Sequence, residues 1–118
     1  DIMENRGQEP TLINGTIHGP GYSGGESITK PYRLMNDRFD TDFHIFGIEW
    51  GEDYIDFFVN NYLVKRLTPV DVTGEWVYNQ PFFLIMNVAV GGNWPGSPDA
   101  TTVFPQRMIV DYVRVYQQ

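Results

Sequence analysis

The sequence predicts an all-β domain, a sandwich or a barrel, and three observations favour this class. No stretch of the 118 residues sustains the 3.6-residue apolar period of a helix. Twelve glycines and 8 prolines interrupt nearly every segment. The segments between them are short and rich in aromatic and β-branched residues, as strands are. We expect strands at residues 43–50, 54–59, 62–67, 82–90 and 108–116.

Two features set the connections and the domain count. Asn60 and Asn61 separate two of the expected strands, and asparagine tolerates the positive φ that a tight hairpin needs. The chain shows no repeat and no linker-like tract, and 42% of its residues are hydrophobic. We therefore expect residues 1–118 to belong to one domain with a packed core.

The composition excludes several classes of partner. A net charge of −7 with only 8 Lys and Arg residues argues against a nucleic acid, which requires a basic face. The apolar runs are too short to cross a membrane. The absence of cysteine removes disulfides, thiolate catalysis and Cys-ligated zinc. A neutral ligand is consistent with this acidic, cysteine-free composition.

The opening residues, DIMEN, carry two acids on one expected strand. Side chains alternate along a strand, so Asp1 and Glu4 would point to opposite faces. A β-bulge between them would turn Glu4 onto the face of Asp1, and we expect one here. Two carboxyl groups on one face can hydrolyse a glycosidic bond when one donates a proton and the other is the nucleophile. Taken alone, the two acids are weak evidence for this chemistry, and two solvated residues of an exposed strand are the more common interpretation.

DIMEN resembles the end of the E-[aliphatic]-D-x-x-E signature of glycoside hydrolase family 16. Four further stretches resemble, in the same order, the second half of that family's domain, particularly in bacterial laminarinases: TIHGPGYSGG, DFHIFGIEW, NQPFFLIMNVAVGGNWPG and MIVDYVRVYQ. The resemblance implies a concanavalin A-like β-jelly-roll sandwich. Residues 1–118 would be the C-terminal portion of its catalytic domain, with the N-terminal portion absent from this chain.

The resemblance also implies roles for the acids. Glu4 matches the general acid/base and Asp1 the acid that tunes the pair, whereas the nucleophilic Glu would lie two residues before Asp1, outside this chain. The fragment alone is then expected to be inactive. His44, in DFHIFGIEW, would lie beside the carboxylates. Its other interpretation is a core or edge histidine satisfied by a backbone group.

Candidate sugar-binding residues come from two loops. His18 lies in HGPGYSG, which the resemblance makes a cleft-lining loop. This stretch also matches G-x-G-x-x-G, but Pro20 and the residues after it offer no helix for a dinucleotide phosphate. Trp94 stands on the Gly- and Pro-rich loop GGNWPG, where its flat apolar ring suits a pyranose face or packs under its own loop. Asn93 beside it offers polar contacts to a sugar.

Three residues outside these loops complete the candidate set. Asn87, on an expected strand, could contact sugar, and Trp50 could floor the cleft or pack in the core. Asp111 interrupts an apolar strand, and the resemblance implies that it binds a structural Ca²⁺ with ligands from the missing N-terminal part. Its other interpretation is an exposed aspartate. Residues 14–16, Asn-Gly-Thr, match a glycosylation sequon.

The resulting functional hypothesis is retaining endo-hydrolysis of β-1,3-glucosidic bonds in laminarin-like glucans. Mixed-linkage β-1,3-1,4-glucan is the nearest alternative substrate, ahead of galactans. A non-catalytic, lectin-like glucan-binding module and a purely structural sandwich are the alternatives from other classes. The expected partners are a β-glucan polysaccharide and the N-terminal half of the domain, and the expected location is extracellular.

Overall fold

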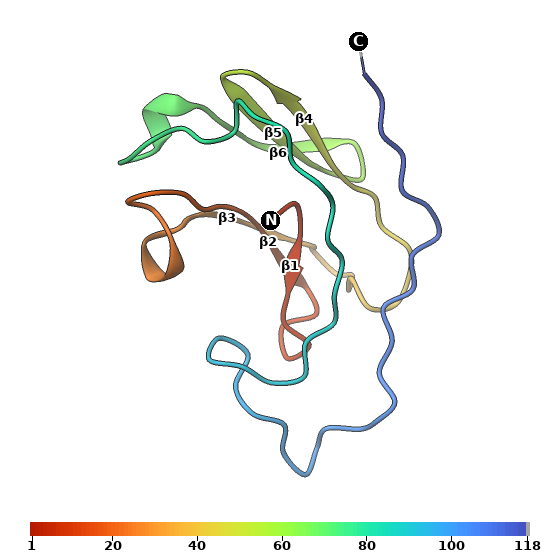
Figure 1. The fold of residues 1–118 in the computed structure, drawn as a ribbon. Coiled ribbons are helices and arrows are strands. Elements are labelled where there is room, and N and C mark those ends of the chain that lie inside the picture. Colours follow the sequence, from red (N-terminus) through yellow and green to blue (C-terminus); the bar gives the residue numbers. More distant parts are fainter. Residues whose placement is uncertain (118) are drawn as a thin grey trace. The chain divides into compact units, whose positions relative to one another are not determined.

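The computed structural model describes residues 1–117 and forms two compact units, residues 1–82 and the residues from Phe83 onward (Figure 1). Six β-strands and two short 3-10 turns, η1 (Gly24–Glu26) and η2 (Pro69–Asp71), are assigned within the described residues, all of them in the first unit. None of the described segments forms a helix that is long and apolar enough to span a bilayer. The predicted all-β class is confirmed.

The first sheet contains three antiparallel strands in the order β1-β2-β3. Their bounds are β1 (Glu4–Asn5), β2 (Leu12–Ile17) and β3 (Ile28–Arg33). Pro31 lies inside β3, which is an edge strand of the described sheet, where a missing N–H need not break the ladder. Sequence reasoning did not identify β2 or β3, because glycine, proline and charged residues dilute their apolar pattern.

The second sheet has the order β4-β5-β6 and is also antiparallel. Its strands are β4 (Phe46–Gly51), β5 (Tyr54–Val59) and β6 (Tyr62–Leu67), so two predicted strands are confirmed with their bounds. Asn60 and Asn61, at φ 48° and 66°, form the predicted hairpin turn. The strand expected from residue 43 begins at Phe46, because the side chain and the backbone N–H of Asn60 occupy the hydrogen-bonding groups of Ile45 at 2.9 Å each.

The two sheets of the first unit lie as two layers, with the apolar core between them (Figure 1). Alternation places Ile17 of β2 and Ile55 and Phe57 of β5 in this core. Gly15 faces the core between the two sheets, and a Cβ there would lie 2.6 Å from Cδ1 of Phe57. The Phe57 ring therefore occupies the space that any larger residue at position 15 would need.

The segment after η2 packs against this core through Val72, Trp76 and Tyr78. Tyr22 is fully buried and its hydroxyl donates to the carbonyl of Glu75 at 2.8 Å. The hydroxyl of Tyr78 accepts from the His18 N–H and donates to the His18 carbonyl, both at 2.8 Å. Burial raises the pKa of the Tyr78 phenol, so the hydroxyl keeps its proton and can hold both bonds. Tyr78 thus fixes the backbone just beyond the end of β2.

The second unit contains no assigned strand among its described residues. The strands predicted at 82–90 and 108–116 are wrong for this structure: no ladder of hydrogen bonds pairs these segments within the described residues, and their apolar side chains are exposed. Composition favours an extended chain, but a strand also needs a hydrogen-bonded neighbour. A tight turn closes between Gly92 and Gly96, whose N–H groups each bond to the other's carbonyl at 3.1 and 2.9 Å.

Substituting Gly15→Ala tests the close approach of the two sheets. We expect the free energy of unfolding to fall by about 1–3 kcal/mol, because the new methyl overlaps the Phe57 ring. Gly47→Ala is the matched control, since a Cβ there meets nothing within 4 Å, and it should change stability by less than about 0.5 kcal/mol. Urea unfolding measures both variants. Equal stability of the two variants would contradict this packing.

Substituting Tyr78→Phe tests the attachment of the 72–78 segment to β2. The ring stays, but the N–H and C=O of half-buried His18 lose their partner, so we expect a loss of about 1–3 kcal/mol in the free energy of unfolding. Tyr62→Phe on the exposed side of β6 is the control and should change stability by less than about 0.5 kcal/mol. Thermal and urea unfolding measure the stability of both variants. A Tyr78→Phe variant as stable as the unaltered protein would refute the role given to this hydroxyl.

Candidate active site

The opening segment contains an extra residue relative to its neighbour β2. Asp1 and Thr16 exchange two backbone hydrogen bonds, from the Thr16 N–H to the Asp1 carbonyl at 3.0 Å and from the Asp1 nitrogen to the Thr16 carbonyl at 2.5 Å. Glu4 then pairs with Asn14. Three steps along the opening segment, from Asp1 to Glu4, therefore match two steps along β2, which is the signature of a β-bulge. The bulge expected from the sequence is present.

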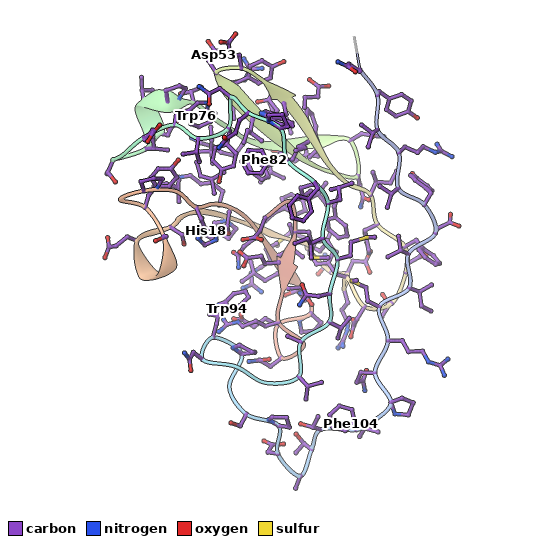
Figure 2. The ribbon with its side chains drawn as sticks, in the orientation of Figure 1. His18, Asp53, Trp76, Phe82, Trp94 and Phe104 are labelled. Atoms are coloured by element: carbon purple, nitrogen blue, oxygen red, sulfur yellow. The ribbon has the colours of Figure 1, made fainter. Side chains whose placement is uncertain are left out.

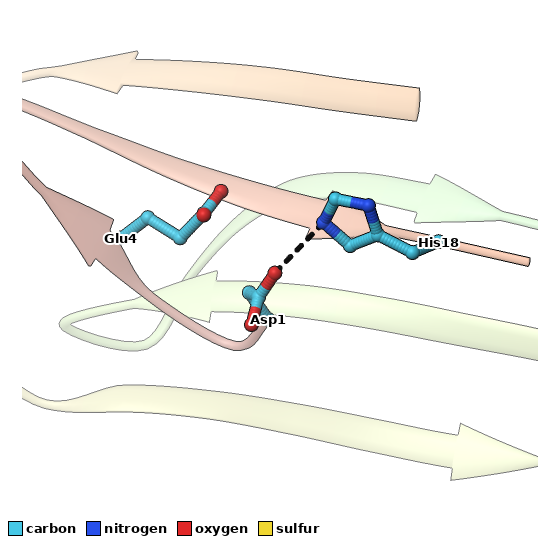
Figure 3. Close-up of side chains that lie close together, drawn as sticks. All are labelled: Asp1, Glu4 and His18. Atoms are coloured by element: carbon cyan, nitrogen blue, oxygen red, sulfur yellow. Dashed lines mark hydrogen bonds and ion pairs between the residues drawn. The ribbon is translucent and has the colours of Figure 1, made fainter. Parts of the chain in front are cut away.

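The bulge brings both acids to one face of the first sheet. Asp1 shares the face of its partner Thr16, and Glu4 shares the face of Asn14, which is the same face because the two partners are two residues apart. His18 lies on this face as well. Figure 3 shows Asp1, Glu4 and His18 pointing toward one another, and one ligand atom of each lies within 4.8 Å of the others.

His18 contacts Asp1 directly. Its Nε2 lies 2.9 Å from Oδ2 of Asp1, and both side chains are partly exposed (Figure 3). Sequence reasoning placed His18 in a cleft-lining loop as a sugar contact. The structure places it one residue after β2, beside an acid and held at its backbone by Tyr78. This contact becomes an ion pair when the imidazole is protonated.

Glu4 is held by a residue that sequence reasoning did not assign to the site. Thr16 is 1% exposed, and its hydroxyl donates to Oε2 of Glu4 at 2.5 Å. The hydroxyl of Thr29, the cross-strand partner of Thr16, lies 3.3 Å from the same oxygen of Thr16. In the sequence Thr16 is the third residue of a sequon and the first residue of TIHGPGYSGG. Its position two residues before His18 is a signal that the two side chains lie on the same side of the chain.

The structure does not bring His44 to the two acids. Its Nδ1 lies 3.0 Å from the side-chain nitrogen of Asn60, and its Nε2 lies 3.3 Å from the carbonyl of Arg38. The ring also packs edge-on against Phe39, at a centroid distance of 5.0 Å. His44 precedes β4, so the alternation of that strand does not fix its direction. One of these contacts is with a backbone group, as the second interpretation expects, and the role of His44 beside the carboxylates stays a prediction.

Trp50 packs within the first unit. Its Nε1 donates to the carbonyl of Tyr78 at 2.6 Å, and its ring meets Phe82 edge-on at a centroid distance of 5.8 Å. Trp50 as a whole remains 44% exposed. In this arrangement Trp50 is a packing residue. Its role as the floor of a cleft stays a prediction.

The remaining candidates lie in the second unit. Asn93 and Trp94 stand on the turn between Gly92 and Gly96, and Figure 2 labels Trp94 on this turn. Trp94 is about half exposed. Asn87 and Asp111 are exposed. The sugar contacts of the first three residues and the Ca²⁺ site at Asp111 stay predictions.

The three clustered groups form a donor set of one imidazole and two carboxylates. Such a set suits a divalent transition metal better than Ca²⁺, which takes six to eight oxygen ligands. The groups are nevertheless satisfied without an ion, because Asp1 bonds to His18 and Glu4 bonds to Thr16. The arrangement supplies a carboxyl group with one oxygen anchored and a second carboxylate nearby. Those are the parts of a proton-transfer site.

The chain is similar to known glycoside hydrolases in both sequence and fold. The sequence profile of Glycosyl hydrolases family 16 matches residues 1–114. The endo-β-1,3-glucanase structure from Pyrococcus furiosus is 50% identical with a TM-score of 0.85, over 89% of this chain and 42% of that one. The laminarinase catalytic domain from Thermotoga petrophila RKU-1 is 50% identical with a TM-score of 0.84, over 88% and 43%.

A beta-glucanase from Rhodothermus marinus is 38% identical over 99% of this chain and 43% of its own length. The chain thus spans less than half the length of these relatives and covers part of a catalytic domain. Over this portion the jelly-roll class predicted from the sequence is confirmed. With a profile match over nearly all of its residues, the chain belongs to glycoside hydrolase family 16.

Proposed function

We infer that this chain forms part of a retaining endo-β-1,3-glucanase that acts on laminarin-like glucans. The observation that carries this proposal is the bulge, which sets Asp1 and Glu4 on one face with a ligand atom of each within 4.8 Å of the other. The solved relatives from Pyrococcus furiosus and Thermotoga petrophila, described as an endo-β-1,3-glucanase and a laminarinase, support the linkage.

Glu4 is the proposed general acid/base. In the first step a carboxylate nucleophile bonds to the anomeric carbon while the C–O bond to the leaving sugar breaks, and Glu4 gives its proton to that oxygen. In the second step water attacks the anomeric carbon, gives a proton back to Glu4 and releases the nucleophile. Each of these two displacements inverts the configuration of the anomeric carbon, so the product retains the configuration of the substrate.

The nucleophile is proposed to be a glutamate two residues ahead of Asp1 in the complete motif. A retaining enzyme needs its two reacting carboxyl groups about 5–5.5 Å apart. Asp1 is hydrogen-bonded to His18 and lies between the proposed nucleophile and Glu4 in sequence, which suits it to tune their charges.

The test is Glu4→Gln in the protein that carries the complete motif. Reducing-sugar release from laminarin should fall by about 10²–10⁴-fold, because the amide cannot transfer a proton. Binding of laminarin, measured by calorimetry, should persist. Glu26→Gln in the exposed η1 turn is the matched control and should keep full activity. Nuclear magnetic resonance of the first products should show the β-anomer.

Each alternative has its own outcome in this experiment. Laminarin binding without sugar release by the unaltered protein would identify a lectin-like module. Faster release from mixed-linkage β-1,3-1,4-glucan than from laminarin would reassign the substrate. Unchanged hydrolysis by Glu4→Gln would remove Glu4 from the mechanism. Absence of any glucan affinity in the unaltered protein would support the purely structural alternative.

A further inference from the structure

The buried hydroxyl of Thr16 has one proton to donate, and its surroundings fix where that proton goes. Glu4 Oε2, at 2.5 Å, is the nearer partner, and a carboxylate only accepts. The Thr29 hydroxyl at 3.3 Å can then donate to the Thr16 oxygen. Thr16 is 1% exposed, so water does not compete for this bond.

Thr16 contacts both acids of the candidate site. Its backbone N–H and carbonyl hold the backbone of Asp1, and its side chain holds the carboxyl group of Glu4. These contacts lie on either side of the bulge. One residue of β2 therefore sets the position of Glu4 relative to Asp1.

Anchoring one oxygen of Glu4 has a chemical consequence. The terminal torsion of a glutamate is broad and loosely fixed by its own chain. With Oε2 bonded to Thr16, Oε1 is the oxygen left to carry the proton toward a leaving sugar. The Thr16 O–H also stabilises the carboxylate that forms when this proton has left.

We propose that Thr16 is a positioning residue for proton transfer by Glu4. The proposal rests on the proposed function, since it needs Glu4 to be the acid/base. Thr16 contacts no substrate in this role and acts through Glu4 alone. Its removal should impair reactions that need a proton for the leaving group and spare those that do not.

The experiment compares Thr16→Val and Thr16→Ser in the enzyme with the complete motif. On a laminari-oligosaccharide, kcat/KM of Thr16→Val should fall by about 10–100-fold, because a misplaced catalytic group loses rate steeply. On a 2,4-dinitrophenyl β-laminarioligosaccharide, whose leaving group departs without a proton, kcat/KM should stay within about 3-fold of the unaltered enzyme. Thr16→Ser keeps the hydroxyl and should recover most of the activity.

The ratio of the two substrates is measured on one sample, so partial misfolding of Thr16→Val changes both values equally and leaves the ratio intact. Thr73→Val is the matched control: it also removes a bonded threonine hydroxyl, which donates to the Gly21 carbonyl, and it should leave the ratio unchanged. Equal losses on the two substrates, unimpaired hydrolysis, or a Thr16→Ser variant as poor as Thr16→Val would each overturn the proposal.

The Glu4→Gln variant distinguishes a failure of the role proposed for Thr16 from a failure of the proposed function. If Glu4→Gln shows the selective loss and Thr16→Val does not, only the role of Thr16 fails. If Glu4→Gln hydrolyses both substrates normally, the assignment of Glu4 fails and the role of Thr16 fails with it.

Discussion

One extra residue in the opening strand is the constraint on which the rest of the site depends. Strand side chains alternate, so Asp1 and Glu4, three residues apart, would lie on opposite faces of a regular strand. The change in register between the Asp1–Thr16 pair and the Glu4–Asn14 pair removes this mismatch. It also places Glu4 within reach of the Thr16 hydroxyl, which gives the carboxyl group a fixed direction.

Strand β2 connects this site to the core. Alternate residues of β2 lie on opposite faces of the sheet. Gly15 and Ile17 face the second sheet, whereas Thr16 and, just beyond the strand, His18 face the acids. Because Gly15 has no side chain, the Phe57 ring packs directly against the backbone that carries Thr16. Close packing resists displacement, so the core holds the backbone from which the site is built.

The parts that the sequence predicted correctly are those fixed by neighbouring residues. The β5–β6 hairpin follows from two apolar runs joined by Asn60 and Asn61. The bulge is expected because two acids three residues apart can share a face only if the strand is irregular between them. Contacts between distant segments could not be predicted in this way. The Thr16–Glu4 bond depends on strand register, and the direction of His44 depends on Asn60 across a hairpin. Segments 82–90 and 108–116 have strand-like composition, but composition cannot supply a pairing partner.

The same alternation bears on the proposed nucleophile. A residue two positions ahead of Asp1 on a continuous strand shares the face of Asp1, because the side-chain period is two. Both acids of that regular stretch would point to one surface, and the bulge adds Glu4 to the same surface. An E-x-D-x-x-E spacing therefore needs its bulge after the aspartate and not before it. The two backbone bonds between Asp1 and Thr16 place the irregularity on that side, between Asp1 and Glu4.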